Sequence, residues 1–360
     1  MRPLDGVLRS PRDVTVEWLT GVMGPKVGAR VVEVEPESVG TGQMGECLRY
    51  RLSWDRPEAG GPASVVVKLA SPDETSRATA QATRSYEREV LFYRHVAGTV
   101  DIRTPHCWHA AFDPATGDFD LVLEDLAPAV QGDQLQGCSA DQAAAVVAEL
   151  AALQAPRWND TTLAGLDWLQ YRDAESVEFV AGLYRGVLDG FVEGLGSLLE
   201  PGAIELARRF ATVIEAWLVG RGPVPTVVTH GDFRLDNMMF GPAGSRVAVV
   251  DWQGPGRGDP AADLAYFLGS GLTTDDRRSH ERDLVALHHR LLSARGVEGY
   301  GFERGLEGYR FHAFGGLVMA VIASQIVVRT ERGDAMFATM ANRHTQQVLD
   351  LDSESLLGGG

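Results

Sequence analysis

The chain has 360 residues, of which 44% are hydrophobic, and its 49 acidic and 33 basic residues give a formal charge of −16. This length and apolar content are sufficient for two lobes with a sizeable core. The negative charge opposes binding to nucleic acid and to anionic membranes, and it favours neutral or cationic ligands.

No targeting or membrane-spanning segment is recognisable. The N-terminus has basic residues but no apolar stretch behind them, which argues against a signal peptide. The longest apolar stretch, residues 315–328, is interrupted by Ser324 and Gln325 and is shorter than the ~20 residues of a membrane span. The three cysteines have no paired spacing, which suits a reducing compartment. We therefore expect a cytoplasmic protein, while its oligomeric state stays open.

A glycine-rich stretch is the first candidate site element along the chain. Gly40, Gly42 and Gly45 have the G-x-G-x-x-G spacing, which lets backbone amides approach phosphate oxygens. A dinucleotide-binding fold would need a helix directly after this loop, but residues 47–52 alternate as a strand does. The stretch is therefore predicted to be a hairpin that covers phosphate groups.

The apolar strand predicted at 65–69 contains one lysine, Lys68. A lysine in such a run is usually an edge residue, but after a glycine-rich hairpin it suits the lysine that contacts the α- and β-phosphates of ATP. The helical pattern at 76–97 carries Glu87 and Glu89, and either could hold Lys68 in place. We favour Glu89, the alternative being that both are ordinary solvated surface residues.

The boundary between the two lobes is predicted within residues 125–137, where proline and glycine interrupt the apolar pattern. The predicted lobes are 1–126 and 127–360, with a helical insert at about 139–225 of the second. The first reads as strands with one long helix. Helices dominate the second, at 141–154, parts of 167–199, 203–219, 276–294, 305–329 and 335–349.

The most informative stretch is residues 230–237, His-Gly-Asp-Phe-Arg-Leu-Asp-Asn. Phosphoryl transfer needs a carboxylate that orients the attacking hydroxyl and accepts its proton, together with oxygen ligands for magnesium. Asp232 and Asn237 supply such a base and such a ligand on one loop. The β-branched run at 247–250 predicts a strand that delivers Asp251 as a second metal ligand. Each residue alone would more often be a turn former, but this combination favours phosphoryl transfer.

The ordered set of glycine-rich hairpin, strand lysine, helix glutamate, hinge, HGDxxxxN and strand aspartate resembles the aminoglycoside phosphotransferase and choline kinase family, relatives of protein kinases. The runs at 251–253 and 258–267 look most similar to the ecdysteroid-kinase-like branch. The resemblance implies an α+β, two-lobed, protein-kinase-like fold, with an N-terminal antiparallel sheet and one long helix, and a larger, mostly helical C-terminal lobe.

The resemblance also implies residue roles. The Glu124 carbonyl and the Leu126 amide, at the end of a buried strand predicted at 121–126, would bind adenine. Asp259 or Asp263 would brace the catalytic loop through backbone hydrogen bonds.

Arg234 follows the base by two residues. By the same resemblance it occupies the position where protein kinases place a lysine near the transferred phosphate. The alternative is a surface arginine paired with Asp236 or another acid. A further feature is Gln154, since many relatives carry a histidine in this segment.

The insert leaves the class of acceptor open. Its acids, among them Asp173 and Glu178, would suit a polyamine such as an aminoglycoside, and its aromatic residues, among them Trp168 and Phe179, would suit a larger alicyclic alcohol. A plain alternative is that the aromatics are helix core and the acids a solvated face. The histidines at 280, 288 and 289 lack an accompanying carboxylate pattern and are expected to be exposed rather than metal ligands.

The leading hypothesis is an ATP- and Mg²⁺-dependent kinase of a small hydroxylated molecule. The alternative is a pseudokinase-like nucleotide-binding scaffold, which loss of the base, the metal ligands or the lysine would indicate, but all of these are present. A protein kinase is disfavoured because Gly231 stands where protein kinases place arginine. In addition, no activation segment is evident between Asp251 and Asp259.

Overall fold

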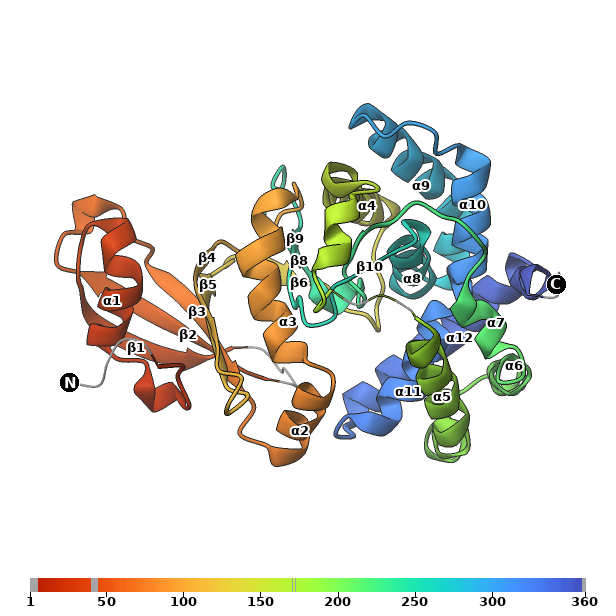
Figure 1. Cartoon of the computed structure of the whole chain (residues 1–360), viewed down its shortest axis with the longest axis horizontal. Helices are drawn as coiled ribbons and strands as arrows, with labels where there is room; N and C mark the ends of the chain where they lie inside the picture. Colours follow the sequence, from red (N-terminus) through yellow and green to blue (C-terminus); the bar gives the residue numbers. More distant parts are fainter. Residues whose placement is uncertain (1–5, 40–44, 170, 172, 358–360) are drawn as a thin grey trace. The chain divides into compact units, whose positions relative to one another are not determined.

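The computed structural model describes residues 6–39, 45–169, 171 and 173–357. The chain divides into two compact units, the first of Met1–Gly98, Thr104–Ala129 and Val250–Gly254, and the second of Thr99–Arg103, Val130–Val249 and Pro255–Gly360. The first unit is built on a sheet and the second on helices (Figure 1). This arrangement confirms the α+β class predicted from the sequence.

A five-stranded antiparallel sheet with the order β1-β2-β3-β5-β4 forms the centre of the first unit. Its strands are β1 (Val31–Ser38), β2 (Gly45–Trp54), β3 (Ser64–Ala70), β4 (Cys107–Phe112) and β5 (Phe119–Glu124). The α-helices of this unit are α1 (Val16–Val27), α2 (Glu74–Ala82) and α3 (Ser85–Leu91).

The pleat of β3 sorts its side chains between the two faces of the sheet. Val65, Val67 and Leu69 are buried in a core that they share with α1. Lys68 points to the opposite face, where Glu89 of α3 lies 2.9 Å from its Nζ. Because side chains alternate along a strand, the same apolar run both builds the core and presents one lysine to α3.

The single helix expected at 76–97 is wrong in detail, because two helices and a π-helical turn occupy this span. Arg84 has a φ of 55°, a left-handed conformation that L-residues avoid within helices, and it separates α2 from α3. The second helix continues into the π turn at Phe92–Val96. Its direction follows from packing, since Tyr86 stacks on Phe119 of β5 with ring centroids 4.3 Å apart.

Helices make up most of the second unit: α4 (Ala140–Gln154), α5 (Ala174–Leu195), α6 (Pro201–Phe210), α7 (Ile214–Val219), α8 (Ala261–Gly271), α9 (Thr274–Ala294), α10 (Phe302–Phe311), α11 (Gly315–Ile326) and α12 (Glu331–Asp350). Two small antiparallel sheets complete it: β7 (Val227–Thr229) pairs with β10 (Gly256–Gly258), and β8 (Met238–Phe240) lies between β6 (Val130–Gln131) and β9 (Ala248–Val249). Helix α8 packs against α10, α11 and α12 and is buried along almost its whole length (Figure 1).

Side-chain caps fix where several of these helices begin. Ser139 forms a capping box at the start of α4, and Asp173 accepts a hydrogen bond from Ser176 N at the start of α5. Thr273 and Thr330 cap α9 and α12 in the same way. Each cap satisfies a backbone amide that the first helical turn leaves without an intrahelical partner.

Two spans expected as continuous helices are each divided. The span at 203–219 forms α6 and α7, with a turn in which the Thr212 hydroxyl donates to a backbone carbonyl at 2.8 Å. The span at 305–329 forms α10 and α11, with a 3-10 turn in which His312 Nε2 lies 3.1 Å from Asp259. In both cases a polar side chain finds a partner at the turn. Among the described residues, no helix combines the length and apolar character needed to cross a membrane.

Candidate active site

The candidate catalytic loop, residues 230–237 of the second unit, connects β7 to β8 and is anchored by α8. The Asp263 carboxylate accepts hydrogen bonds from the backbone amides of His230, at 2.7 Å, and Gly231, at 3.1 Å. Gly231 has a φ of 83°, which side-chain-bearing residues rarely adopt. The loop therefore enters its turn at a glycine and is fixed there by a buried carboxylate.

The two aspartates considered for bracing this loop have different partners. Asp263 contacts the loop itself, and burial raises the pKa of its carboxyl group. Asp259 instead lies 3.0 Å from Arg221 and 3.1 Å from His312. Burial would raise the pKa of Asp259, but the hydrogen bond and charge of His312 and the charge of Arg221 outweigh it and lower that pKa. Bracing of the loop backbone is thus a property of Asp263.

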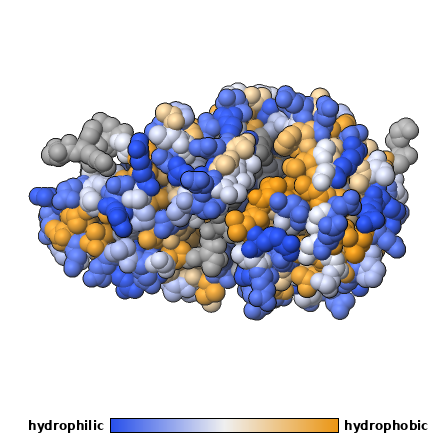
Figure 2. Space-filling model, turned by 90° about the horizontal axis from the view of Figure 1, so that it is seen from below, coloured by the Kyte–Doolittle hydropathy of each residue, from blue (hydrophilic) through white to orange (hydrophobic). Residues whose placement is uncertain are grey.

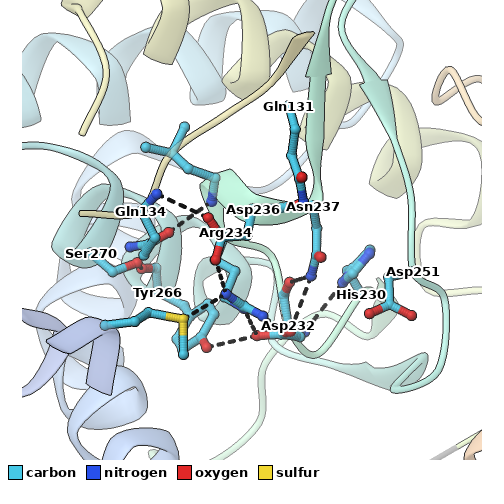
Figure 3. A network of polar contacts seen from close by, with 12 residues as sticks. Gln131, Gln134, His230, Asp232, Arg234, Asp236, Asn237, Asp251, Tyr266 and Ser270 are labelled. Carbon is cyan, nitrogen blue, oxygen red and sulfur yellow. Dashed lines mark hydrogen bonds and ion pairs between the residues drawn. The ribbon is translucent and has the colours of Figure 1, made fainter. Parts of the chain in front are cut away.

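Three donors surround the carboxylate of Asp232 (Figure 3). The Tyr266 hydroxyl donates to Oδ1 at 2.8 Å, Asn237 Nδ2 donates to Oδ2 at 3.0 Å, and Arg234 Nε lies 3.1 and 3.0 Å from the two oxygens. The Asp232 side chain nevertheless keeps 28% exposure. The carboxylate is therefore both oriented and accessible, as a general base must be.

The orientation of Asn237 follows from the hydrogen bonds that its side-chain amide donates. Its Nδ2 donates to the Asp232 backbone carbonyl at 2.8 Å as well as to the carboxylate. Its Oδ1 accepts no hydrogen bond from any residue in the described part of the chain. One side chain thus holds the loop together and leaves an amide oxygen for another ligand.

Arg234 forms ion pairs with two acids. Its Nη1 lies 2.8 Å from Asp236 Oδ2, in addition to its contact with Asp232. Burial would lower the pKa of Arg234, but the charges of Asp232 and Asp236 contribute to raising it. Despite its burial, Asp236 has a lowered pKa because Arg332 and Arg234 favour its carboxylate form. The pair with Asp236 considered from the sequence is present, and a second pair joins Arg234 to the candidate base.

In the first unit, Lys68 lies between two acids. Its Nζ is 2.9 and 2.8 Å from the two oxygens of Glu89 and 2.8 Å from Asp251 Oδ1. Burial would lower the pKa of Lys68, but Asp251 and Glu89 raise it, so the lysine stays charged. Burial raises the pKa of Glu89. Glu87 instead pairs with Arg84 at 2.7 Å, so Glu89 is the partner of this lysine.

Asp251 occupies an unusual backbone conformation, with a φ of 66°. Non-glycine residues in this region are uncommon and often lie at functional sites. The next residue, Trp252, is fully buried and stacks on Phe92 with ring centroids 3.8 Å apart and an interplanar angle of 3°. Phe92 begins the π-helical turn after α3, so this irregular turn supplies the ring that holds the Asp251 segment.

The glycine-rich stretch is described only at its end. Gly40 and Gly42 lie outside the described residues, whereas Gly45 begins β2. A Cβ at position 45 would meet the Leu69 carbonyl oxygen at 3.0 Å. The close approach of β2 and β3 therefore favours glycine at this position.

The end of β5 offers backbone groups of the kind expected for adenine. Glu124 Oε2 accepts a hydrogen bond from His106 N at 2.9 Å, which fixes the side chain beside the strand end. The half-buried Leu126 amide donates to no acceptor among the residues that the structure describes, while the Leu126 carbonyl accepts from Ala129 N at 2.8 Å. A backbone amide of this kind can donate a hydrogen bond to a ring nitrogen.

The acids and aromatics of the insert divide into different structural classes. Trp168 is only 5% exposed and belongs to the core, whereas Phe179 is 68% exposed. Asp173 is the N-cap of α5, and Glu178 is exposed on the same helix. The expected solvated acidic face and aromatic core are thus present, with Phe179 and Tyr171, which is 55% exposed, as exceptions.

One basic side chain near the catalytic strand has a distinctive setting. Arg257 of β10 is paired in register with Val228 of β7, and its guanidinium carbon lies 4.1 Å from the ring centroid of Tyr171. Its Nε is buried and has no hydrogen-bond partner within the described ranges. The positive charge of Arg257 therefore lies beside the exposed ring of Tyr171. It stands on a strand that pairs with β7, which leads into the candidate catalytic loop.

The expectation that the α9 histidines are exposed is wrong for His288, which is 3% exposed. Its Nε2 lies 2.8 Å from Gln154 Oε1, and Gln154 Nε2 donates to the Pro260 carbonyl at 2.9 Å. Gln154 thus links α9 to the residue before α8. Across the described residues, no group of three or more His, Cys, Asp or Glu side chains is arranged to hold a metal ion.

Two residues of the site were missed from the sequence, Tyr266 and Gln134. The Gln134 side chain accepts from Leu235 N at 2.9 Å, and its backbone amide donates to Asp236 at 3.0 Å. Tyr266 could have been found, because it follows Asp263 at helical spacing and so shares its face of α8. No comparable signal marks Gln134, which lies about a hundred positions earlier in the chain.

Comparisons with known proteins place this geometry in context. Choline kinase from Cryptosporidium parvum is 10% identical with a TM-score of 0.57, over 90% of this chain and 91% of that chain. Ethanolamine kinase from Plasmodium vivax is 11% identical with a TM-score of 0.54, over 97% and 91%. A GDP complex of wild-type aminoglycoside 2′-phosphotransferase-IIIa is 12% identical with a TM-score of 0.51, over 92% and 98%. These likenesses show a shared kinase-like phosphotransferase fold.

Sequence matches to curated proteins are short. Acyl-CoA dehydrogenase family member 10 of Mus musculus is 55% identical over 42 residues, 11% of this chain and 4% of that protein. Acyl-CoA dehydrogenase family member 11 of Homo sapiens is 56% identical over 39 residues, 11% of this chain and 5% of that protein. The chain thus matches only a small part of the length of these relatives.

The family model described as phosphotransferase enzyme family (APH) matches residues 48–311. This range includes Lys68, Glu89, Asp232, Asn237 and Asp251, whose contacts are given above. Because the match covers more than half of the chain, the protein belongs to the phosphotransferase enzyme family.

Proposed function

We propose that this protein transfers the γ-phosphate of ATP, with Mg²⁺, to a hydroxyl group of a small molecule. The observation that carries the proposal is the Asp232 carboxylate, which three donors orient and which stays 28% exposed. Family membership supports phosphoryl transfer, and the fold likeness to choline and ethanolamine kinases supports a small acceptor.

Asp232 would act as the general base. Its carboxylate orients the acceptor hydroxyl and takes its proton as the oxygen attacks the γ-phosphorus. A new oxygen–phosphorus bond forms while the bond from the γ-phosphorus to the β,γ-bridging oxygen breaks, and ADP leaves. Arg234, held against Asp232 at 3.0 Å, would place positive charge near the transferred group.

The nucleotide would bind to groups of the first unit. Lys68 would contact the α- and β-phosphates, with Glu89 fixing its side chain at 2.9 Å. The Glu124 carbonyl and the Leu126 amide would receive adenine, and the glycines at 40, 42 and 45 would cover the phosphates. A neighbour of the same fold is a GDP complex, so ATP and GTP should be compared as donors.

The donor set fits magnesium. Asn237 has an amide oxygen without a protein donor in the described residues, and the Asp251 side chain is 39% exposed beside Lys68. Mg²⁺ prefers oxygen ligands and uses few from the protein because phosphates and water supply the rest. We propose that Asn237 and Asp251 hold the ion, which when bound would neutralise charge on the phosphates.

We propose a neutral alcohol rather than a polycation as the acceptor. Asp173 is engaged as a helix cap, and Arg257 would repel an ammonium group close to Tyr171. Figure 2 shows hydrophobic residues, in orange, on the surface of the molecule. The exposed apolar side chains of the second unit include Phe179, at 68% exposure, and Val328, at 52%. Three free thiols and the use of ATP support a cytoplasmic location.

Salt dependence tests the acceptor class. For a neutral acceptor, KM should change little between low and high salt, because no charge-assisted contact is screened. Asp173→Asn, which preserves the helix cap, and Glu178→Gln should leave KM unchanged. A steep salt dependence that these two substitutions abolish would instead establish a polycationic acceptor.

The proposed activity itself is tested by ADP release in the presence of magnesium and ATP or GTP. The panel contains neutral alicyclic alcohols, choline, ethanolamine, an aminoglycoside and, after the names of the matched relatives, a hydroxylated acyl-CoA. We expect acceptor-dependent release with one of these classes, and release slower by about two to four orders of magnitude with Asp232→Asn. Tight nucleotide binding without turnover on any of them would favour the alternative, a nucleotide-binding scaffold.

A further inference from the structure

We propose that Tyr266 is a positioning residue for Asp232, an inference that rests on the proposed function. Its hydroxyl donates to Asp232 Oδ1 at 2.8 Å, and the tyrosine is only 5% exposed. The side chain is therefore too deeply buried to serve as an acceptor contact. Figure 3 shows the hydroxyl bonded to the Asp232 carboxylate, so the tyrosine would act on the reaction through the carboxylate that it holds.

Tyr266 gives Asp232 a constraint that the other donors do not supply. Asn237 contacts only Oδ2, and the single Nε of Arg234 is shared between both oxygens at 3.1 and 3.0 Å. Without Tyr266, Oδ1 would keep only this shared contact. The tyrosine therefore fixes the rotation of the carboxyl group and leaves the remaining lone-pair positions in a defined direction.

Helix α8 anchors the loop at two levels. Asp263 accepts from the backbone amides of His230 and Gly231, and Tyr266, three residues later, reaches the side chain of Asp232. Residues three apart lie on the same face of a helix. One helical turn thus holds both the backbone of the catalytic loop and its reactive carboxylate.

The tyrosine ring is itself fixed by packing. It stacks on His344 of α12 with centroids 5.9 Å apart and an interplanar angle of 29°, and His344 Nδ1 lies 2.8 Å from the Ala313 carbonyl oxygen. Glycines on two other helices make room for the imidazole. A Cβ at Gly269 would lie 2.5 Å from His344 Cε1, and one at Gly316 would lie 1.9 Å from Nε2.

Charged and titratable groups surround the Tyr266 hydroxyl. Asp232 and Arg234 face it from the loop, Asp263 lies on the same helix, and His344 lies on α12. Burial and the Asp232 charge raise the pKa of Tyr266, which keeps the hydroxyl protonated and able to donate. Removal of this donor should lower the turnover rate, because the carboxylate would lose the contact that fixes Oδ1.

The direct test is Tyr266→Phe, which keeps the ring and removes the hydroxyl. With the acceptor found by the ADP-release panel, kcat should fall about ten- to a hundredfold, the range for a hydrogen bond to a charged group. The KM for ATP should stay within about twofold, because the tyrosine contacts no group assigned to the nucleotide. A wild-type kcat, or a kcat and a KM for ATP that change together, would overturn the proposal.

Tyr309→Phe is the matched control. Like Tyr266, Tyr309 is buried and donates to a carboxylate, that of Glu281, at 2.8 Å. Both substitutions therefore remove a similar bond from the second unit, and their effects on thermal stability should be comparable. Only Tyr266→Phe should lower kcat at an unchanged KM for ATP. Equal kinetic effects of the two variants would show that Tyr266 has a merely structural role.

A double-mutant cycle separates this inference from the proposed function. In the Asp232→Asn background, Tyr266→Phe should cause no further loss of turnover, because a residue that acts through Asp232 has nothing left to position. The same loss in both backgrounds would contradict the inference. If Asp232→Asn itself kept wild-type turnover, the proposed function would fail first.

A second variant addresses the case in which Tyr266→Phe folds poorly. Incorporation of 3-fluorotyrosine at position 266 preserves the ring and hydroxyl but makes the hydroxyl a stronger donor. The kcat should then stay within about twofold of the wild-type value, because the hydrogen bond to Asp232 is retained. A loss of about tenfold or more despite the retained hydroxyl would count against this hydrogen bond as the group that acts during catalysis.

Discussion

Asn237 illustrates how a single side chain can serve two purposes in the candidate site. Its amide nitrogen donates to the backbone and side chain of Asp232 at 2.8 and 3.0 Å, while its amide oxygen is left for another ligand. The spacing between the two residues allows this because a short 3-10 turn brings Asn237 back towards Asp232. An aspartate here could not donate these bonds and would add charge beside the base.

The first expectation at this scale concerns Asp232→Asn. The amide keeps the shape of the side chain but cannot accept the hydroxyl proton, so kcat should fall by about two to four orders of magnitude. ATP affinity, measured by calorimetry, should be unchanged because Asp232 is assigned no nucleotide contact. Asp283→Asn, an exposed residue of α9, is the control. Near-normal turnover in Asp232→Asn would remove Asp232 from the role of base.

The second concerns Asp251→Asn and the metal. Asparagine tolerates a φ of 66° better than alanine does, so the substitution tests charge rather than backbone strain. Mg²⁺-dependent ATP binding should be lost because a neutral amide is a weaker ligand for a hard cation. Calorimetric titration of ATP with and without Mg²⁺ measures this, and an unchanged metal dependence would show that the ion is held elsewhere.

At the scale of elements, the helices around α8 approach one another closely at small residues. His344 of α12 fits between Gly269 of α8 and Gly316 of α11, where added Cβ atoms would overlap its ring. Close packing of this kind transmits any change in volume to the neighbouring side chains. The position of Tyr266 therefore depends on glycines that do not touch the catalytic loop.

Alanine substitutions test this packing. Gly316→Ala should lower the free energy of unfolding by about 1–3 kcal/mol, because the new methyl group forces His344 to move. Gly186→Ala in α5 is the control, since nothing lies within 4 Å of a Cβ there. It should raise stability by about 0.5–1 kcal/mol through the loss of backbone entropy in the unfolded chain. Urea denaturation measures both, and equal effects would contradict the packing argument.

At the scale of the whole molecule, buried histidines link stability to pH. Burial lowers the pKa of His288 to about 3 and that of His344 to about 4. Both values lie below the ordinary histidine value of 6.5, so the unfolded chain binds protons first as the pH falls. The stabilisation is complete above pH 6.5 and is lost progressively as the pH falls towards the folded values.

Thermal unfolding between pH 7.5 and 5 tests this linkage in a range where most carboxylates stay ionised. The free energy of unfolding should fall below pH 6.5 by about 1.4 kcal/mol per pH unit for each histidine. His288→Gln removes one titrating group and should reduce the slope by that amount. A slope that the substitution does not change would show that His288 is protonated in the folded chain.

The sequence by itself determined the class of fold and singled out the chemical groups of the candidate site. Asp232 and Asn237 stand out as candidates because phosphoryl transfer requires a base and oxygen ligands at short, fixed spacing. Lys68 is recognisable because one charge in an apolar strand must point away from the core. Periodicity likewise indicated the sheet-rich first part and the helical second part, since each pattern reflects one buried face. The boundary at 126 stays a prediction.

Only the tertiary structure decided which residues meet. It assigned Lys68 to Glu89, the loop backbone to Asp263 and the Asp232 carboxylate to Tyr266. These contacts join segments far apart in the chain. Several residues could chemically make each contact, and packing that local patterns do not encode decides between them. The division of the expected helices has the same origin, because a contact formed elsewhere outweighs helix propensity at the turn.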